Sequence, residues 1–345
     1  MQTGAVGTIS RRSALALGAG VALGVAGCTS SSGHPSAAGS PSSRSATPAA
    51  PAPSPTLASP SSSPSPSPSA SATLHLTAPW RPSPNDVQPE VKLRAVRLIE
   101  ALGTWPVGGQ GLAAARKRAA DAGYDPALAD QAGGLLVAAP EAAVQVLEAQ
   151  YGGILSDSAS VLVVCRQYTP GNDSGGTTVD VRLSAAQPQW DVTALHPATP
   201  GPAAASLTTA ARAVLADVEA ITLPPAAHAD VLSGNVHDSA LNGLLTLARS
   251  HRIMLSVVRS GHPLYVFGTT RPSDHPKGRA FDVWTIDGHP VIDPATPRAL
   301  VESFMRAAAA AGSYNVGGPY LLSGSGNQFF SDDTHHDHVH VGFDY

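Results

Sequence analysis

Two short stretches of the chain carry side chains that could meet around one metal ion. The first contains His275 and Asp282, and the second, close to the last residue, contains His338 and His340. Side chains two positions apart in a strand point to the same face, so His338 and His340 would project together. Catalytic zinc usually takes three protein ligands, with mixed imidazole and carboxylate sets among them, and keeps one position open for water. His275, Asp282 and His340 supply that set.

A turn and a strand would position the first pair of side chains. Pro276 and Gly278 punctuate a turn that would carry His275 in a loop. The following segment, 280–284, suits an extended and partly buried strand. Because side chains alternate along a strand, Asp282 would lie on the face opposite to its two apolar neighbours.

The second stretch is expected to form a strand over residues 338–343. Within a strict strand, Asp337 would face away from His338 and His340. This difficulty eases if the strand begins at His338 and Asp337 still belongs to the preceding loop. A structural Asp that orients a neighbouring His is the alternative interpretation of Asp337.

These residues resemble the motifs of the zinc D-Ala-D-Ala carboxypeptidase family and its relatives, which share the hedgehog-type fold. In the second motif the family usually has a Glu three residues before the final His, whereas this chain has Asp337. The resemblance covers the C-terminal part of the chain, from about residue 205 onward. The first motif, Ser-x-His-x-x-Gly-x-Ala-x-Asp, matches at every fixed position: Ser273, His275, Gly278, Ala280 and Asp282.

The resemblance implies a zinc ion on His275, Asp282 and His340, with Asp337 in the acid/base position. Zinc lowers the pKa of bound water and polarises a carbonyl, so the implied reaction is amide hydrolysis. Asp337 would take the proton of the water and return it to the leaving amine. His338 would stabilise the oxyanion or make an outer contact, and it competes with His340 for the ligand role.

The resemblance also implies an arginine just upstream of the first motif, which helps to hold the substrate or its developing charge. The usual Ser-Gly-Tyr-Arg order is not kept here, so Arg259 and Arg271 are both candidates. A surface position is the alternative for each of them.

Four further histidines are expected to lie outside the metal site. His262 and His289 would satisfy turns, and His335 and His336 would face solvent because nothing upstream pairs with them.

The N-terminal residues carry an export pattern. Arg11 and Arg12 resemble a twin-arginine motif, and the apolar run 14–27 is too short to cross a bilayer as a helix. The residues before Cys28 resemble a bacterial lipobox, whose Cys is lipidated and becomes the first mature residue. An ordinary cleaved signal with a coincidental Cys is the alternative. We therefore expect residues 1–28 to be a lipoprotein signal and the mature chain to be anchored on the extracellular side of the cell membrane.

Residues 29–78 form a tract rich in Ser, Pro and Ala that buries too little apolar surface to fold. We interpret it as a disordered stalk, which favours extended conformations and would lift the remainder off the membrane. Beyond it, 43% hydrophobic residues in the whole chain allow a real core. With a net charge of −4 and 13% charged residues, we expect no nucleic-acid partner.

Residues 79–203 predict an α+β domain in which we see no chemistry, so scaffolding is the default role. Apolar spacing predicts a helix over 91–102 that ends at Gly103, and period-two alternation marks a three-stranded antiparallel meander. Cys165 would be a buried thiol on the first of these strands. The further segments are helical patterns at 112–122 and 141–150 and strands at 161–168, 178–183 and 189–195.

Residues 204–345 predict the zinc peptidase-like domain, a small antiparallel sheet with packed helices. Asp238 would cap a helix that reaches residue 248, and a strand would follow at 255–258. Thr296 would cap the last helix, which Gly312 is placed to close. The fold class expected for the whole chain is therefore α+β.

The function expected from these patterns is zinc-dependent hydrolysis of peptide bonds in peptidoglycan stem peptides, of the D,D-carboxypeptidase or endopeptidase type. The partners would be peptidoglycan peptides and, through lipidated Cys28, the membrane, and the chain would be a monomer. One alternative is a non-catalytic lipoprotein that keeps the fold and binds wall peptides or a partner. Another is a zinc-binding lipoprotein that uses the His-rich stretch 334–340.

Overall fold

The structure, a computed structural model, describes residue 74 and residues 77–345. The predicted signal, its lipidation site Cys28 and nearly all of the stalk therefore lie outside the described residues. Among the residues that are described, no helix combines the length and the apolar character needed to span a bilayer.

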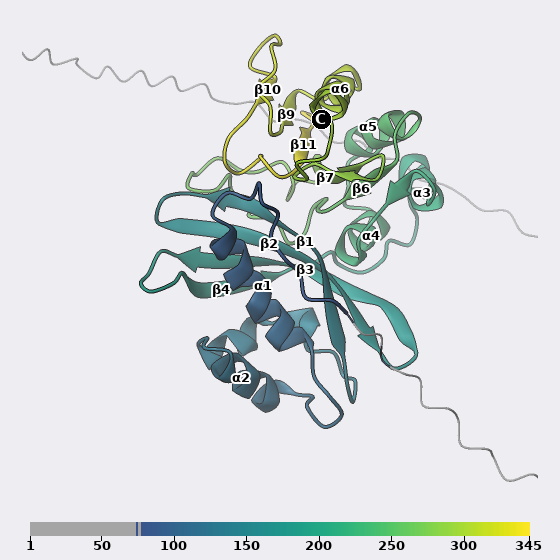
Figure 1. Cartoon of the computed structure of the whole chain (residues 1–345). Coiled ribbons are helices and arrows are strands. Elements are labelled where there is room, and N and C mark those ends of the chain that lie inside the picture. The colour runs from purple at the N-terminus through teal and green to yellow at the C-terminus, as the bar shows by residue number, and fades with distance from the viewer. Residues whose placement is uncertain (1–73, 75–76) are drawn as a thin grey trace, which may run out of the picture. The chain divides into compact units, whose positions relative to one another are not determined.

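The described residues 77–345 belong to one compact unit. We call residues 79–203 the N-terminal region and residues 204–345 the C-terminal region. Figure 1 shows the long strands of the N-terminal region between its own helices and the C-terminal region.

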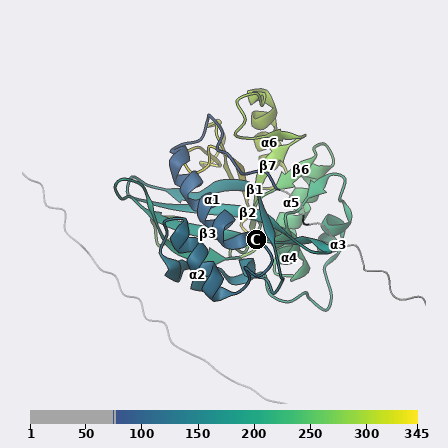
Figure 2. The ribbon, with the colours of Figure 1, turned by 60° about the horizontal axis from the view of Figure 1, so that its bottom comes forward.

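The N-terminal region is a four-stranded antiparallel sheet of order β1-β2-β3-β4, one face of which is covered by helices. Figure 2 brings α1 and α2 in front of the strands. The expected helices at 91–102 and 112–122 and the strands expected at 161–168 and 189–195 are confirmed within about three residues, while the strand expected at 178–183 begins earlier, at Asn172. The sheet has four strands, not the three that were expected. The elements are α1 (Pro89–Gly103), α2 (Leu112–Asp121), two 3-10 turns (Pro126–Gln131 and Gly133–Leu135), β1 (Ala143–Ile154), β2 (Ser158–Thr169), β3 (Asn172–Ser184) and β4 (Asp191–Pro197).

The prediction of a helix over 141–150 is wrong, because this segment forms most of the first strand, β1. Ala149 and Tyr151 pack into the core under α1, while Gln150 between them reaches into the C-terminal region. A strand buried on both faces loses the period-two alternation that identifies strands in a sequence. The register of β1 also shifts between Val146 and Glu148 and again after Tyr151, which breaks the pattern further.

Helix α1 shows why the sequence signal was strong there. Pro89 stands in its first turn, and apolar side chains recur at helical spacing toward the sheet. Lys92 is the exception on the buried face, since it is only 1% exposed. The sequence pattern did not single it out.

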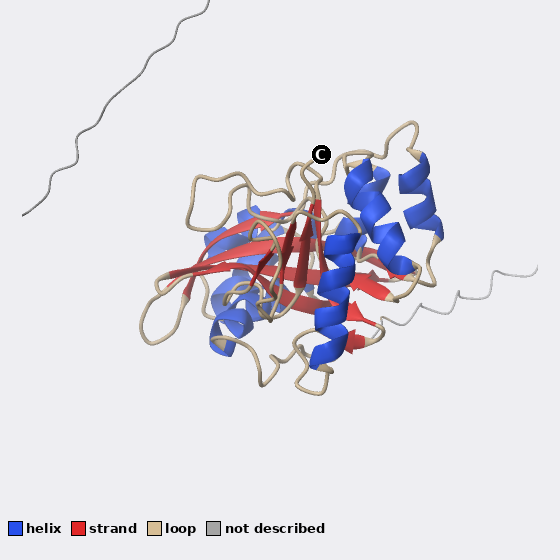
Figure 3. Cartoon of the chain, turned by 90° about the horizontal axis from the view of Figure 1, so that it is seen from above, coloured by secondary structure: helices blue, strands red, loops and turns tan. Residues whose placement is uncertain are grey.

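The C-terminal region contains a mixed sheet, which corrects the expectation of a small antiparallel one. Its strand order is β10-β9-β11-β7-β6-β5, with β8 paired to β7, and the β5–β6 and β9–β10 pairs are parallel. The helices pack on this sheet around a second core, and Figure 3 shows the helices and strands of both regions from above. The elements are α3 (Thr209–Ala216), β5 (Ile221–Thr222), α4 (Pro225–Leu232), α5 (Asp238–Ala248), β6 (Ile253–Leu255), β7 (Ala280–Ile286), β8 (His289–Pro290), α6 (Arg298–Ala310), β9 (Asn315–Gly317), β10 (Phe329–Phe330) and β11 (Val339–Gly342).

Two expected helix caps are wrong. His237, not Asp238, occupies the N-cap of α5, and Asp238 accepts a bond from Thr208 instead. Pro297 occupies the N-cap of α6, and the Thr296 hydroxyl donates to the Pro290 carbonyl. Both caps were predicted from residue type. In the folded chain each of the two side chains instead forms a hydrogen bond with another nearby group.

The two regions meet along the second face of the first sheet. Leu162 and Val164 on β2 pack with Val257, which follows β6. Gly153 on β1 lies so close to Phe267 that an added Cβ would overlap its side chain, at 2.0 Å. The expected α+β class is confirmed, and the face of β1 turned toward the C-terminal region lies next to the predicted metal residues.

Candidate metal centre

Strand pairing brings the two predicted metal motifs together. In the antiparallel pair β7 and β11, His340 lies directly opposite Asp282, so both side chains point to the same face. His275 arrives from the turn before β7, where Gly278 adopts a φ of +70° and its N–H donates to the His275 carbonyl. β11 begins at Val339, one residue later than expected, and Asp337 belongs to the preceding loop, as expected.

The three predicted ligand side chains converge. Nε2 of His275 lies 3.1 Å from Nδ1 of His340 and 3.1 Å from Oδ1 of Asp282. Nδ1 of His340 lies 3.0 Å from the same oxygen. Ligand atoms of a tetrahedral zinc with bonds of about 2.0–2.1 Å are about 3.3 Å apart, so these three donors fit such an ion after a small outward movement.

The outer hydrogen bonds of these side chains suit the same role. Nδ1–H of His275 donates to the Val258 carbonyl at 2.8 Å, which leaves Nε2 with its lone pair facing the cluster. The amide of Gln150 donates to Oδ2 of Asp282 at 2.7 Å, which leaves Oδ1 toward the two imidazoles. Bonds of this kind orient metal ligands in proteins.

The electrostatics favour the protonation states that a metal needs. Burial lowers the pKa of His340 to about 4, even though the Asp282 carboxylate raises it, so the imidazole is neutral near pH 7. Burial alone would raise the pKa of Asp282, but the imidazoles of His275 and His338 hold it well below its usual range. A neutral imidazole and an ionised carboxylate are the forms that bind divalent cations.

Asp337 does not face this cluster directly. Its Oδ1 accepts the Nδ1–H of His338 at 2.6 Å, and its Oδ2 accepts bonds from the Lys92 ammonium and from the N–H of Tyr151. Nε2 of His338 lies 3.7 Å from Oδ1 of Asp282. Burial lowers the pKa of His338, but the Asp282 and Asp337 carboxylates raise it by more. Burial raises the pKa of Asp337, but the Lys92 and His338 charges lower it by more, to well below the usual range of an aspartate.

The two candidate arginines lie in different places. Arg271 lines the cleft beside the metal residues, a cavity of about 670 Å³. The guanidinium of Arg259 instead donates to the Pro200 carbonyl and lies 3.7 Å from Asp230. Of the two, only Arg271 is in reach of a molecule bound in the cleft.

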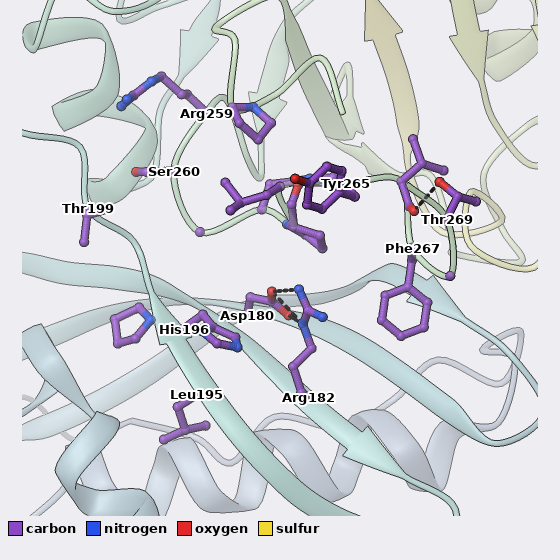
Figure 4. A pocket seen from close by; sticks show the side chains of 18 residues that line it. Asp180, Arg182, Leu195, His196, Thr199, Arg259, Ser260, Tyr265, Phe267 and Thr269 are labelled. Carbon is purple, nitrogen blue, oxygen red and sulfur yellow. Dashed lines mark hydrogen bonds and ion pairs between the residues drawn. The ribbon is translucent and has the colours of Figure 1, made fainter. Parts of the chain in front are cut away.

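Arg259 lines a second cavity of about 700 Å³ on the far side of the loop 259–269. Figure 4 shows Arg182 paired with Asp180 on the sheet and the Arg259 side chain extending away from that pair. His262 and Phe267 line both cavities, so the loop separates two adjoining hollows.

Two of the histidines expected to lie elsewhere, His262 and His335, are in fact close to the cluster. His262 stacks on His275 with ring centroids 4.1 Å apart, and its nitrogen lies within 4.8 Å of the ligand atoms of His275 and Asp282. His335 lines the cleft and donates to Asp332, and its ring centroid is 5.2 Å from that of His338. We infer the ligand role of His340, not His262, from its shorter distances.

His336 is also partly buried and belongs to a second acidic cluster with Asp86 and Asp337. Nδ1–H of His336 donates to the Asp333 carbonyl, and Nε2 accepts the N–H of Val87. The Lys92 ammonium already bonds to both carboxylates. This cluster therefore holds a protein cation in the position that a metal would take.

The N-terminal region supplies side chains to the site that the sequence did not indicate. Gln150 and the Tyr151 N–H come from β1, Lys92 comes from α1, and Tyr151 to Ile154 form one wall of the cleft. In the sequence, the feature that could have indicated Lys92 and Gln150 is that each is a polar residue within an otherwise apolar stretch.

Comparisons of this chain with models of protein families, with curated proteins and with solved structures found no match.

Proposed function

We propose that the chain is a zinc-dependent hydrolase that cleaves peptide bonds in peptidoglycan stem peptides, as a D,D-carboxypeptidase or an endopeptidase. The observation that carries the proposal is the convergence of His275, Asp282 and His340 to within 3.0–3.1 Å of one another beside an open cleft. Each of these residues is at most 8% exposed. Bound zinc would supply Lewis-acid chemistry, activating water and polarising the scissile carbonyl.

The geometry supports His338, with Asp337 behind it, as the group that moves the proton. Asp337 holds the Nδ1–H of His338, so Nε2 can accept a proton from a water molecule in the cleft and later return it to the leaving amine. This revises the role expected for Asp337, whose two oxygens are already bonded to protein donors. Asp337 then acts as the carboxylate that orients a histidine.

The substrate class is supported by the cleft and by the sequence before it. Arg271 on its wall would bind a carboxylate, such as the C-terminus of a stem peptide. The export pattern, the lipobox ending at Cys28 and the Ser/Pro/Ala stalk favour a site of action at the cell wall. A peptide segment fits a cleft of about 670 Å³.

A non-catalytic wall-peptide or partner-binding lipoprotein is the second candidate, because Asp337 is turned away from the cluster. Metal buffering by residues 334–340 is less well supported. The nitrogens of His336 both have partners in the chain, and Nδ1 of His335 and of His338 is bonded to a carboxylate.

Metal analysis and a digestion assay test the proposal together. Purified protein should bind one zinc ion, and His275→Ala and His340→Ala should each abolish that binding. The zinc-loaded protein should release D-alanine or cleaved stems from peptidoglycan fragments, measured by mass spectrometry. In His338→Gln, zinc should stay bound while the rate falls by about 100-fold or more. Stoichiometric zinc without cleavage of any stem peptide would favour the binding lipoprotein.

A further inference from the structure

A lysine side chain lies buried where the N-terminal region meets the loop that carries His338. Lys92 on α1 is 1% exposed, and its ammonium bonds to Asp86 and, at 2.6 Å, to Oδ2 of Asp337. The same ammonium lies 5.0 Å from the centroid of the Tyr151 ring. Both carboxylate side chains are at most 2% exposed, so this is an internal ion cluster.

Stability alone does not account for a lysine at this position. Removing charges from water is expensive, and apolar side chains of similar volume often replace a buried ion pair without loss of stability. The adjacent buried positions of α1, Val91 and Ala95, are apolar. What distinguishes Lys92 is therefore the group on which its charge acts.

That group is the carboxylate behind His338. Oδ2 of Asp337 accepts bonds from Lys92 and from the Tyr151 N–H, so both of its outer donors come from the N-terminal region. The rotation of the carboxylate is thus set by α1 and β1. Its other oxygen accepts the Nδ1–H of His338, and Nε2 of that ring lies 3.7 Å from Oδ1 of Asp282.

On the basis of the proposed function, we propose that Lys92 is a positioning residue for the hydrolytic reaction. Its ammonium fixes Asp337, and Asp337 fixes the ring orientation and the tautomer of His338. The N-terminal region is then part of the catalytic centre, although none of its side chains is among the three predicted metal ligands.

Asp86 offers a matched control, because it is the other partner of the same ammonium. Lys92→Met removes the charge and keeps a side chain of similar length. Asp86→Asn breaks the companion ion pair but leaves the bond between Lys92 and Asp337 in place. A lysine that only ties α1 to the preceding loop would make the two variants equally harmful.

The expected result is a split between the variants in the hydrolysis of a synthetic stem pentapeptide ending in D-Ala-D-Ala. Lys92→Met should lower kcat by about 10–100-fold, with KM and zinc content unchanged. A loss of this size is typical when an outer partner of a functional group is mutated. Asp86→Asn should keep kcat within about threefold of the unchanged protein. Thermal unfolding of each variant checks that it is folded.

A measurement without substrate separates this proposal from the proposed function. ¹⁵N NMR of the histidine rings, assigned with His338→Gln, should report the Nδ1–H tautomer of His338 in the unchanged protein and in Asp86→Asn. In Lys92→Met the Nε2–H tautomer should appear. If this change is seen but no protein form cleaves stem peptides, the positioning role stands and the hydrolase assignment fails.

Should Lys92→Met not fold, the double variant Lys92→Met/Asp86→Asn takes its place. In the double variant only one buried carboxylate, that of Asp337, has lost the lysine, whereas in Lys92→Met two have lost it. The same loss of kcat and the same tautomer change are expected in it. An unchanged kcat and tautomer in a folded Lys92 variant would overturn the proposal, as would an equal loss of kcat in Asp86→Asn.

Discussion

Asp337 and His338 show at the residue scale how a neighbouring side chain changes the role of a group. The family resemblance implied an acid/base position for Asp337, but in the fold its oxygens bond to Lys92, Tyr151 and His338. Nε2 of His338 lies on the side of Asp282, at 3.7 Å from its Oδ1. In the function that we propose, the acid/base role therefore moves from Asp337 to His338, because Lys92, far away in sequence, bonds to Asp337.

Glu148 on β1 offers a test of the buried charges at the same scale. Burial raises the pKa of its carboxyl from 4.5 to about 8, although the Lys92 ammonium lowers it. Between these pH values the folded protein holds a proton that the unfolded chain has lost, so the free energy of unfolding falls as pH rises. Glu148→Gln should remove this slope. From pH 5 to pH 8 the free energy of unfolding of the variant should therefore rise by roughly 3 kcal/mol relative to that of the original protein.

Urea unfolding at several pH values measures this effect. Glu90→Gln is the control, since Glu90 is an exposed residue in the first turn of α1 and should leave the slope unchanged. A Glu148→Gln protein whose stability depends on pH as steeply as the original between pH 5 and pH 8 would contradict the assignment.

At the scale of elements, one turn connects two of the predicted ligands. His275 precedes Gly278 and Asp282 follows it, and a Cβ at Gly278 would lie 2.2 Å from the Asn235 carbonyl oxygen. We expect Gly278→Ala to cost roughly 2–4 kcal/mol of stability, from left-handed strain and from the clash. It should also weaken zinc binding, because the two ligands move apart.

Gly288 is a matched control for this prediction. It has a φ of +83° and no atom within 4 Å of an added Cβ, so Gly288→Ala meets the strain without the clash. It should cost about 1 kcal/mol and leave zinc binding intact. Thermal unfolding and zinc titration of both variants measure the two effects. Equal losses of stability and of zinc affinity in the two variants would contradict the role of the clash at Gly278.

The elements also show what the sequence could reveal. β7 and β11 are buried on nearly their whole length, and turn residues and the spacing of the His and Asp side chains marked them. α1 and α2 were predictable because each buries one apolar face at helical spacing. Residues 141–150 were not, because β1 is covered on both faces and its register shifts twice. The same double burial makes β1 a wall of the cleft, so the segment that sequence analysis misread is also one that the site depends on.

At the scale of the whole molecule, the two regions depend on each other at the candidate site. The C-terminal region supplies His275, Asp282 and His340, while Gln150 and Lys92 hold the surrounding groups from the other side. A protein of residues 204–345 alone should bind zinc at least about tenfold more weakly than residues 77–345, because the outer bonds are lost. It should also unfold at a lower temperature, since the apolar contact around Val257 is exposed.

Calorimetric zinc titration of the two proteins measures this difference. The intact 77–345 protein with Gln150→Met serves as an intermediate, because it removes only the bond to Asp282. Equal zinc affinity in all three would show that the N-terminal region is a separate scaffold, as the sequence suggested.

Local patterns in the chain were enough to predict the spacing of His275, Asp282 and His340, the α+β class and most of the helices and strands. These features follow from periodicity and residue type within single segments. The face of β1 that meets the cluster and the neighbours of Asp337 and Arg259 became known from the folded chain alone. Such contacts depend on residues that are distant in sequence and on burial that leaves no periodic trace, so no local pattern could contain them.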